Sequence, residues 1–209
     1  MKIGIIGIGN VGSVLGRKWA AKGHDIRFGI RDLNNEKFLE LKAQYPLKIH
    51  GRDVEETIEF GEILVLAVPW ESAKKILRDA KNLEKKIIND CTNPIKDLST
   101  LQVGQTTSAA EIIQDIAKTA RIVKGFNTIG ANIMEDPIFN GIKADTFICG
   151  NDIEAKKIVA TLAEEIGFNV VDVGELSLAR YLEPLALLWI NMSLNPKYQR
   201  NIAFKLLKR

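Results

Sequence analysis

Cysteine and histidine are scarce in this chain of 209 residues, which has two of each. It contains no Cys-x-x-Cys pair and no cluster of cysteine with histidine, so we expect no structural zinc site and no other metal. Cys91 and Cys149 each lie in or beside an apolar run, which is typical of small buried side chains in a reducing compartment.

Long runs of one charge sign and apolar runs of membrane-spanning length are also missing. The 29 basic and 26 acidic residues leave a net charge of +3, a surplus too small to indicate nucleic acid binding. Residues 1–7 are mostly apolar, but glycines interrupt them and no small-residue cleavage site follows, so we expect no signal peptide. The sequence therefore predicts no membrane insertion and favours the cytoplasm.

Short apolar runs alternate with helical patterns along almost the whole chain. Strands are expected at 2–6, 25–28, 47–49, 62–68, 86–89, 121–124, 146–149 and 169–173. Helices are expected at 11–22, 36–45, 54–60, 71–83, 109–119, 154–166, 177–192 and 197–207. This alternation predicts an α/β fold with a doubly wound, mostly parallel sheet and helices on both faces. We expect residues 1–175 to form this domain, with residues 176–209 as a short C-terminal helical extension packed on it.

Two irregular segments and two helix caps complete the expected outline. Residues 92–107 and 127–145 read as long loops, which in compact domains are more often functional than idle. Ser108, with Glu111 three residues later, is expected to cap one helix. Asn151 or Asp152 is expected to cap another.

The sequence GIGNVG near the N-terminus matches the dinucleotide-binding pattern G-x-G-x-x-G. It follows an expected strand directly and opens an expected helix, as the Rossmann-type fold requires. Gly7 permits the tight turn, Gly9 lets the backbone approach a pyrophosphate, and Gly12 lets helix and strand pack closely. The free amides at the helix start, which include those of Asn10 and Val11, would then face the pyrophosphate.

The end of the second strand indicates which dinucleotide is bound. An NAD-selective site places an acidic residue there, whereas this chain has Gly29 with Arg31 two residues later. A guanidinium suits the 2′-phosphate of NADP(H), and Lys37 could add a second positive charge. Asp32 is the competing possibility, because it could bind the ribose and repel the phosphate. We expect NADP(H) rather than NAD(H).

Three further segments carry a family resemblance: VLAVPW at 65–70, IVKGFNTIGA at 122–131 and DVGELSLAR at 172–180. Together with the Gly29-Ile30-Arg31 turn, they resemble the deazaflavin-dependent NADP oxidoreductases. They are also similar to the cytosolic oxidoreductase domain of the STEAP metalloreductases. The resemblance extends over nearly the whole chain, and the Lys-Gly-Phe-Asn run is its most specific part.

This resemblance implies hydride transfer between NADPH and a small redox acceptor with a flavin-like ring, a deazaflavin or another flavin. By position, Arg31 would bind the 2′-phosphate, and Val68, Pro69 and Trp70 would line the ribose and nicotinamide side. The floor on which the two rings stack would be formed by Asn127, Thr128 and Ala131. Two positions depart from the family: Ile30 replaces a common serine, and Asn127 stands where the deazaflavin enzymes carry histidine. The second departure leaves flavins other than a deazaflavin open.

The residues for acid–base chemistry are few. We interpret His24 and His50 as structural, because His24 lies at the end of the sheet away from the expected cofactor. Lys124, at the carboxyl end of a strand, is the best candidate for a proton donor, although a lysine with a packed stem is an equal alternative. Cys91 has no evident base, and Asn93 lies in a turn beside the cofactor.

Three functions therefore remain open. The first is an NADPH-dependent reductase of flavin-like acceptors, since a hydride acceptor of this kind needs no dedicated acid. The second is an imine or β-hydroxyacid-type reductase with Lys124 as its acid, and the third is an NADP(H)-sensing protein without catalysis. About thirty residues follow the last strand and could cover one side of a cleft or pair with a second subunit, so we expect a homodimer. Their apolar members are Ile190, Met192, Leu194, Ile202, Phe204, Leu206 and Leu207.

Overall fold

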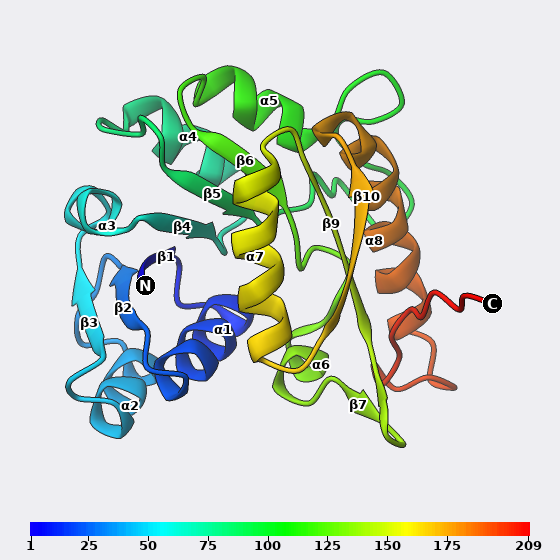
Figure 1. Ribbon diagram of the computed structural model, residues 1–209, viewed down its shortest axis with the longest axis horizontal. Helices are drawn as coiled ribbons and strands as arrows, with labels where there is room; N and C mark the ends of the chain where they lie inside the picture. Colours follow the sequence, from blue (N-terminus) through cyan, green and yellow to red (C-terminus); the bar gives the residue numbers. More distant parts are fainter.

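The computed structural model describes residues 1–209 and is built around one eight-stranded sheet (Figure 1). The strand order across the sheet is β10-β9-β6-β5-β4-β1-β2-β3. The strands are β1 (Lys2–Ile6), β2 (Asp25–Gly29), β3 (Ile49–Arg52), β4 (Ile63–Leu66), β5 (Ile87–Asp90), β6 (Arg121–Lys124), β9 (Asp145–Gly150) and β10 (Asn169–Gly174). A separate hairpin pairs β7 (Ile138–Phe139) with β8 (Ile142–Lys143).

All neighbouring strands from β3 to β6 pair in parallel, and β9 alone pairs antiparallel to its neighbour β6. The edge strand β10 then runs parallel to β9. The order reverses at β1, where β2 lies on one side and β4 on the other. The predicted doubly wound, mostly parallel sheet is confirmed, and its switch point between β1 and β4 is where such folds bind ligands.

Helices cover both faces of the sheet (Figure 1). A larger apolar cluster of 28 buried residues packs one face against α1 (Asn10–Ala21), α2 (Glu36–Gln44), α6 (Ala131–Glu135) and α7 (Ile153–Glu165). A second cluster of 19 packs the other face against α3 (Val54–Phe60), α4 (Trp70–Asp79), α5 (Ala109–Ile116) and the start of α8 (Ala179–Ser193). A short 3-10 turn, η1 (Leu176–Leu178), precedes α8. No helix is both long enough and apolar enough to cross a membrane.

Strand β4 shows why the strand sequences are apolar without interruption. Its side chains alternate between the two faces, so Ile63 and Val65 join the larger cluster while Leu64 and Leu66 join the smaller one. Because both faces are covered by helices, neither set of side chains meets water, and every position in the strand is apolar.

The predicted helix caps are present. The Ser108 hydroxyl accepts a hydrogen bond from the Glu111 amide at the start of α5. Of the two residues considered for α7, Asp152 accepts from the Ala155 amide. Asn151 instead accepts from the Leu176 amide and joins η1 to the start of α7.

The structure corrects the sequence-based outline in five places. Strand β3 is Ile49–Arg52 rather than 47–49. Helix α4 ends at Asp79 rather than at residue 83, and α5 ends at Ile116 rather than at residue 119. The predicted loop 127–145 contains α6 and the β7–β8 hairpin. The predicted helix at 197–207 is wrong: this tail has no regular structure, since Gln199 and Arg200 have left-handed backbones and Asp145 binds the end of the tail.

Candidate active site

Three cavities lie around the glycine loop, two of them at the carboxyl ends of the central strands. The first, which we call the Arg31 pocket, has a volume of about 370 Å³ and lies beside β1 and β2; its lining includes Gly7, Gly29, Arg31, Asp32, Val68, Pro69 and Ser72. The second, the Asn93 pocket, has about 320 Å³ and is lined by Asn10, Val11, Ala67, Val68, Pro69, Trp70, Cys91, Thr92, Asn93 and Ile95. The third, the Trp189 cleft, has about 780 Å³ and is described below.

The glycine loop lies between these cavities, and each predicted glycine role can be checked against the space around it. Gly7 has a φ of +106°, and a Cβ there would lie 2.6 Å from the Ala67 carbonyl oxygen, so this tight turn needs glycine. A Cβ on Gly12 would lie 2.2 Å from the Gly7 carbonyl oxygen, so helix and loop could not pack. A Cβ on Gly9 would meet nothing within 4 Å. The protein itself leaves open space at the position where the backbone was predicted to approach a pyrophosphate.

Helix α1 begins at this open space without a side-chain cap. Its N-cap is Gly9, no side chain bonds to its first amides, and no acidic residue lies in its first turn. The first amides of a helix have no partner within the helix, and the helix dipole places partial positive charge there. In a helix of 12 residues, this bare N-terminus and the open space at Gly9 fit the diphosphate of a dinucleotide.

The Arg31 pocket has the chemistry expected for a phosphorylated ribose. Arg31 lines it and is exposed. The Asp32 carboxylate, the predicted competitor, instead accepts a hydrogen bond from the Asn34 amide within its own turn. Arg31 takes part in none of the salt bridges that arginines form, which involve Arg17, Arg52, Arg121 and Arg180. Its guanidinium is therefore available for a phosphate.

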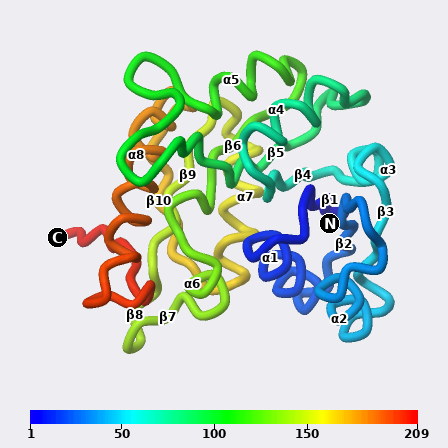
Figure 2. Tube along the Cα trace, turned by 180° about the vertical axis from the view of Figure 1, so that it is seen from behind, coloured from blue at the N-terminus to red at the C-terminus, as the bar shows by residue number.

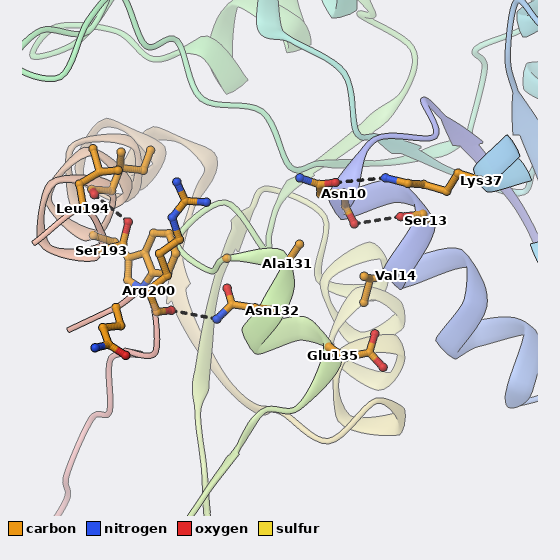
Figure 3. A pocket seen from close by; sticks show the side chains of 14 residues that line it. Asn10, Ser13, Val14, Lys37, Ala131, Asn132, Glu135, Ser193, Leu194 and Arg200 are labelled. Carbon is orange, nitrogen blue, oxygen red and sulfur yellow. Dashed lines mark hydrogen bonds between the residues drawn. The ribbon is translucent and has the colours of Figure 1, made fainter. Parts of the chain in front are cut away.

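Lys37 does not join Arg31. It lines the Trp189 cleft, where its Nζ donates a hydrogen bond to Asn10 Oδ1 at 3.1 Å (Figure 3). Asn35, two residues earlier at the start of α2, lines the Arg31 pocket. The predicted pairing of Lys37 with Arg31 on one phosphate therefore finds no support in the structure.

Val68 and Pro69 form the wall between the Arg31 pocket and the Asn93 pocket, because both residues line both cavities. Trp70 follows as the first residue of α4 and lines only the Asn93 pocket of these two. Lys74 Nζ lies 3.6 Å from the centre of the Trp70 ring, a cation–π contact. A dinucleotide that crosses this wall would have one ribose on each side of Pro69.

Two asparagines bind each other behind the Asn93 pocket. Asn93 Nδ2 donates to the Asn127 carbonyl oxygen at 2.9 Å, and Asn127 Nδ2 donates to Asn93 Oδ1 at 3.0 Å. Asn127 Nδ2 also donates to the Leu182 carbonyl oxygen of α8. Asn127 Oδ1 and Thr92 Oγ1 are buried and have no hydrogen-bond partner within the chain. Unpartnered buried polar atoms are costly, and here they lie next to the cavity where a nicotinamide carboxamide would fit.

Lys124 is part of a buried group of three charges. Its Nζ lies 2.8 Å from Asp90 Oδ2 and 2.9 Å from Glu183 Oε1, and it donates to the Thr92 carbonyl oxygen. Its side chain has no exposed surface. Burial disfavours the ammonium, but the two carboxylates prevail and hold the pKa of Lys124 above its ordinary value. Glu183 also accepts from the first amides of α5, those of Ala109 and Ala110.

The remaining candidates lie in different parts of the structure. His24 is buried and binds Glu165 at 2.7 Å and the N-terminal amine, at the amino ends of the strands and so at the opposite end from the Arg31 and Asn93 pockets. Burial raises the pKa of the Cys91 and Cys149 thiols, so neither is a thiolate. Thr128 is buried and lines none of the three cavities, whereas Ala131 lines the Trp189 cleft.

The Trp189 cleft is the largest of the three cavities. Side chains from four separate segments line it: the start of α1, Lys37 of α2, the α6 region, and the end of α8 with the tail (Figure 3). Asn10 lines both this cleft and the Asn93 pocket, so the two cavities meet at the glycine loop. Figure 2 shows the chain after β5 passing over α8, where Asn191 Nδ2 donates to the Leu98 carbonyl oxygen.

Sequence reasoning missed three charged residues that the structure places in or beside the candidate site. Asp90 and Glu183 are the partners of Lys124, and a lysine in an apolar strand is itself a signal that buried carboxylates should be sought. Arg200 lines the Trp189 cleft but was predicted to lie in a helix. No local signal identifies it, because its place depends on how the tail returns to the domain.

A bare helix N-terminus after a glycine loop, with an unpaired arginine beyond β2, defines the chain as a Rossmann-type dinucleotide-binding protein. Comparison with known proteins specifies the family. Residues 2–94 match the family described as NADP oxidoreductase, coenzyme F420-dependent. Because relatives named for the same activity are 31% and 32% identical over 95% and 100% of the chain, the chain belongs to this family.

Known proteins match this chain over nearly its whole length, although some of them are much longer than it. The chain is 31% identical to the F420-dependent NADP reductase of Methanocaldococcus jannaschii, with 95% of this chain and 94% of that protein covered. It is 30% identical to the rat metalloreductase STEAP3 over 89% of this chain and 36% of that protein. A crystal structure described as a candidate F420-dependent NADP reductase from Arthrobacter sp. FB24 superimposes with a TM-score of 0.89 at 32% identity, over 100% of both chains. A reductive aminase from Aspergillus terreus shares the fold, with a TM-score of 0.70 at 18% identity over 95% of this chain and 63% of that one.

Proposed function

We propose that the protein transfers a hydride between NADPH and a deazaflavin of the F420 type. The observation that carries this proposal is the set of three cavities around the uncapped start of α1, with an unpaired guanidinium in the Arg31 pocket and the largest cavity on the other side of the glycine loop. We assign the Arg31 and Asn93 pockets to the dinucleotide and the Trp189 cleft to the second ring system. Relatives of nearly the same length are named F420-dependent NADP reductases, which supports this acceptor.

The chain's residues position the two reactants. NADPH would supply the hydride when bound. The α1 amides and Gly9 would hold its diphosphate, Arg31 would bind its 2′-phosphate, and the wall at Val68 and Pro69 would separate its two halves. Two residues that line the Asn93 pocket, Trp70 and Thr92, have unpartnered polar atoms (Nε1 and Oγ1) that could orient a carboxamide, and the unpartnered Asn127 Oδ1 lies behind them, on the side chain bonded to Asn93. Holding two reactants in contact and away from water is most of what hydride transfer requires.

Lys124 is not suited to donate a proton. It has no exposed surface, it is ion-paired with Asp90 and Glu183, and its pKa is raised. A general acid needs a pKa near the working pH and access to the substrate. We therefore propose that Lys124 is a structural cation, which leaves the imine or β-hydroxyacid-type reductase without its acid. A flavin-like acceptor needs none.

Turnover with a panel of acceptors tests the proposal. The protein is mixed with NADPH and, separately, with F420, FMN, FAD and riboflavin, and the loss of each acceptor's visible absorbance is followed. We expect the highest kcat/KM with F420. Faster reduction of FMN or riboflavin would show that the acceptor is an ordinary flavin and not a deazaflavin. This outcome would agree with Asn127 in place of the histidine of the deazaflavin enzymes. Tight NADPH binding without turnover on any acceptor would favour the third function, an NADP(H)-sensing protein.

We also propose that the chain forms a homodimer in the cytoplasm. Support for the dimer comes from exposed apolar side chains on and beside α8, namely Tyr181, Leu188 and Leu194. Support for a reducing compartment comes from Cys91 and Cys149, which are both free. Sedimentation velocity of the purified protein tests the dimer, and Leu188→Glu is expected to shift it towards a monomer.

A further inference from the structure

The side chain of Thr92 carries an inference that rests on the proposed function and extends it to the recognition of the nicotinamide ring. Thr92 lines the Asn93 pocket and is 4% exposed, yet its Oγ1 has no hydrogen-bond partner within the chain. Trp70 lines the same pocket and is 5% exposed, and its Nε1 also has no partner. Burying a polar atom without a partner is costly, so two such atoms at one cavity indicate a ligand that completes their hydrogen bonds.

These two atoms match the chemistry of a primary carboxamide, the substituent of a nicotinamide ring. An indole N–H can only donate, so Trp70 Nε1 would pair with the carboxamide oxygen. A hydroxyl can donate or accept, so Thr92 Oγ1 would then accept from the carboxamide NH2 group. A ketone in place of the carboxamide would still bind Trp70 but would leave Thr92 Oγ1 without a donor.

The backbone of Thr92 is held at both of its polar groups by two charged side chains. Asp90 Oδ1 accepts from the Thr92 amide at 2.9 Å, and Lys124 Nζ donates to the Thr92 carbonyl oxygen at 2.6 Å. Asp90 Oδ2 also lies 2.8 Å from Lys124 Nζ, so the three residues form a closed ring of hydrogen bonds. Neither charged side chain has exposed surface, which strengthens these bonds because water does not compete for them.

Glu183 extends this ring to α8 and α5. Its Oε1 lies 2.9 Å from Lys124 Nζ, and its two oxygens accept from the first two amides of α5. Asp90 ends β5, Lys124 ends β6 and Glu183 belongs to α8, so three elements hold the position of Thr92. A fixed backbone leaves the Thr92 hydroxyl few positions, because a β-branched side chain is stiff at χ1.

We propose that Asp90, Lys124 and Glu183 are positioning residues, which fix Thr92 so that its Oγ1 accepts a hydrogen bond from the carboxamide of NADP(H). They act through Thr92, since none of the three lines the Asn93 pocket. Stability alone does not account for this group, because well-packed apolar side chains in place of a buried ion pair are often equally stable or more so. The positioning role gives the three charges a function at the site.

Binding of two dinucleotides tests the contact made by Thr92 and needs no hydride acceptor. The Kd values of NADP⁺ and of its 3-acetylpyridine analogue, in which a methyl group replaces the NH2 of the carboxamide, are measured by calorimetry. We expect the unmodified protein to bind NADP⁺ about 10-fold more tightly than the analogue, a difference of roughly 1.4 kcal/mol. Thr92→Val removes only the hydroxyl, which has no partner within the chain, so we expect this variant to fold and to lose most of the preference.

The variant Asp90→Asn tests the positioning role. In either orientation of the new amide, its NH2 group would face a donor, the Lys124 ammonium or the Thr92 amide, so the ring of hydrogen bonds is broken. We expect this variant to lose the preference as Thr92→Val does, whereas a merely structural role would weaken both dinucleotides equally. The matched control is Asp145→Asn, which changes another buried aspartate that accepts from a main-chain amide and a lysine. It should keep the preference.

Each outcome bears on the inference. Equal binding of the two dinucleotides by the unmodified protein, or an undiminished preference in Thr92→Val, would overturn the contact. An undiminished preference in folded Asp90→Asn would overturn the positioning role, and if that variant does not fold, Glu183→Gln is measured and read in the same way. A preference that Thr92→Val and Asp90→Asn both lose, in a protein that does not reduce F420, would count against the proposed function alone.

Discussion

At the scale of single residues, the glycine loop contains two glycines that the fold requires and one that only a bound ligand would require. Gly7 and Gly12 are required by the backbone around them, since a Cβ on either would lie within 2.6 Å of a carbonyl oxygen. Gly9 has an ordinary φ of −66° and open space beside it. The fold gives no reason for glycine at this position, whereas close approach of a diphosphate does.

A pair of alanine variants tests this distinction. Gly9→Ala is expected to change the free energy of unfolding by less than about 1 kcal/mol and to weaken NADPH binding by roughly 10-fold or more. Gly12→Ala is expected to lower the free energy of unfolding by about 1–3 kcal/mol, because its Cβ overlaps the Gly7 carbonyl. Urea unfolding and NADPH titration measure both effects. Equal loss of stability in the two variants would contradict the assignment.

We expect Arg31 to be the residue that selects NADPH over NADH. Arg31→Gln is expected to weaken NADPH binding roughly 10- to 100-fold, the effect of losing one or two charge-assisted hydrogen bonds, and to leave NADH binding nearly unchanged. Equilibrium titration with both dinucleotides measures the change. If NADPH and NADH lost affinity equally, Arg31 would not be the group that recognises the 2′-phosphate.

Lys124 has a structural effect that can be measured. Lys124→Met leaves Asp90 and Glu183 as buried carboxylates without their cation, so we expect it to lower the free energy of unfolding by about 3–5 kcal/mol. Urea unfolding measures this loss. A variant as stable as the unmodified protein would show that the three charges contribute no net stability.

The raised pKa of Lys124 also leads to a prediction about the pH dependence of stability and of kcat. Its pKa is raised above the ordinary value of 10.5, so its contribution to stability is fully present below that pH and is lost only as the pH rises through the higher pKa of the folded state. The pH profile of kcat between pH 6 and 9 should therefore show no titration from Lys124. An ionisation in this interval that disappears in Lys124→Met would contradict the structural assignment and restore an acid role.

At the scale of elements, the sequence predicted the sheet well and the tail poorly. Strands such as β4 are recognisable because both faces are buried and every position is apolar. The helix caps at Ser108 and Asp152 are local interactions and are equally recognisable. The cofactor half of the site is predictable for the same reason, because the glycine loop and Arg31 belong to one βαβ unit of contiguous sequence.

The rest of the site depends on contacts between distant segments. The Trp189 cleft joins α1, α2, α6 and the tail, and no local pattern indicates that these elements meet. The tail has a helical apolar pattern at 197–207, yet it runs without regular structure because its polar backbone groups find partners in the domain. Asp145 of β9 accepts from the Leu206 amide and from Lys205 Nζ, and the Asp145 amide donates to the Phe204 carbonyl oxygen.

Asp145 is therefore the anchor of the tail. Burial opposes its charged form, but hydrogen bonds from Leu206 and Lys205 prevail and lower its pKa below the ordinary value of 3.8. The contribution of Asp145 to the free energy of unfolding is therefore fully present above pH 3.8. It is lost as the pH falls through the lower pKa of the folded state. Asp145→Asn is expected to speed hydrogen exchange at the Leu206 amide, because the charged acceptor of its hydrogen bond becomes a neutral amide. Unchanged exchange would show that the tail is held elsewhere.

At the scale of the whole molecule, the sheet brings the reactants together. The strand order reverses at β1, so the cavity beside β2 and the cavity beside β5 lie on either side of one glycine loop. Helices from both faces then close the cleft, with α4 on one side and α1, α6 and α8 on the other. Under the proposed function, the Arg31 and Asn93 pockets would hold the dinucleotide and the Trp189 cleft would hold the acceptor.

Hydride transfer between two bound molecules is the central claim, and isotopic labelling tests it most directly. The protein is mixed in a single turnover with F420 and NADPH that carries deuterium at the position of the transferred hydrogen, and the products are analysed by mass spectrometry. Direct transfer in a closed cleft predicts that the reduced deazaflavin contains the deuterium. Reduced deazaflavin without deuterium, or deuterated NADPH that stays unoxidised while F420 is bound, would contradict the account.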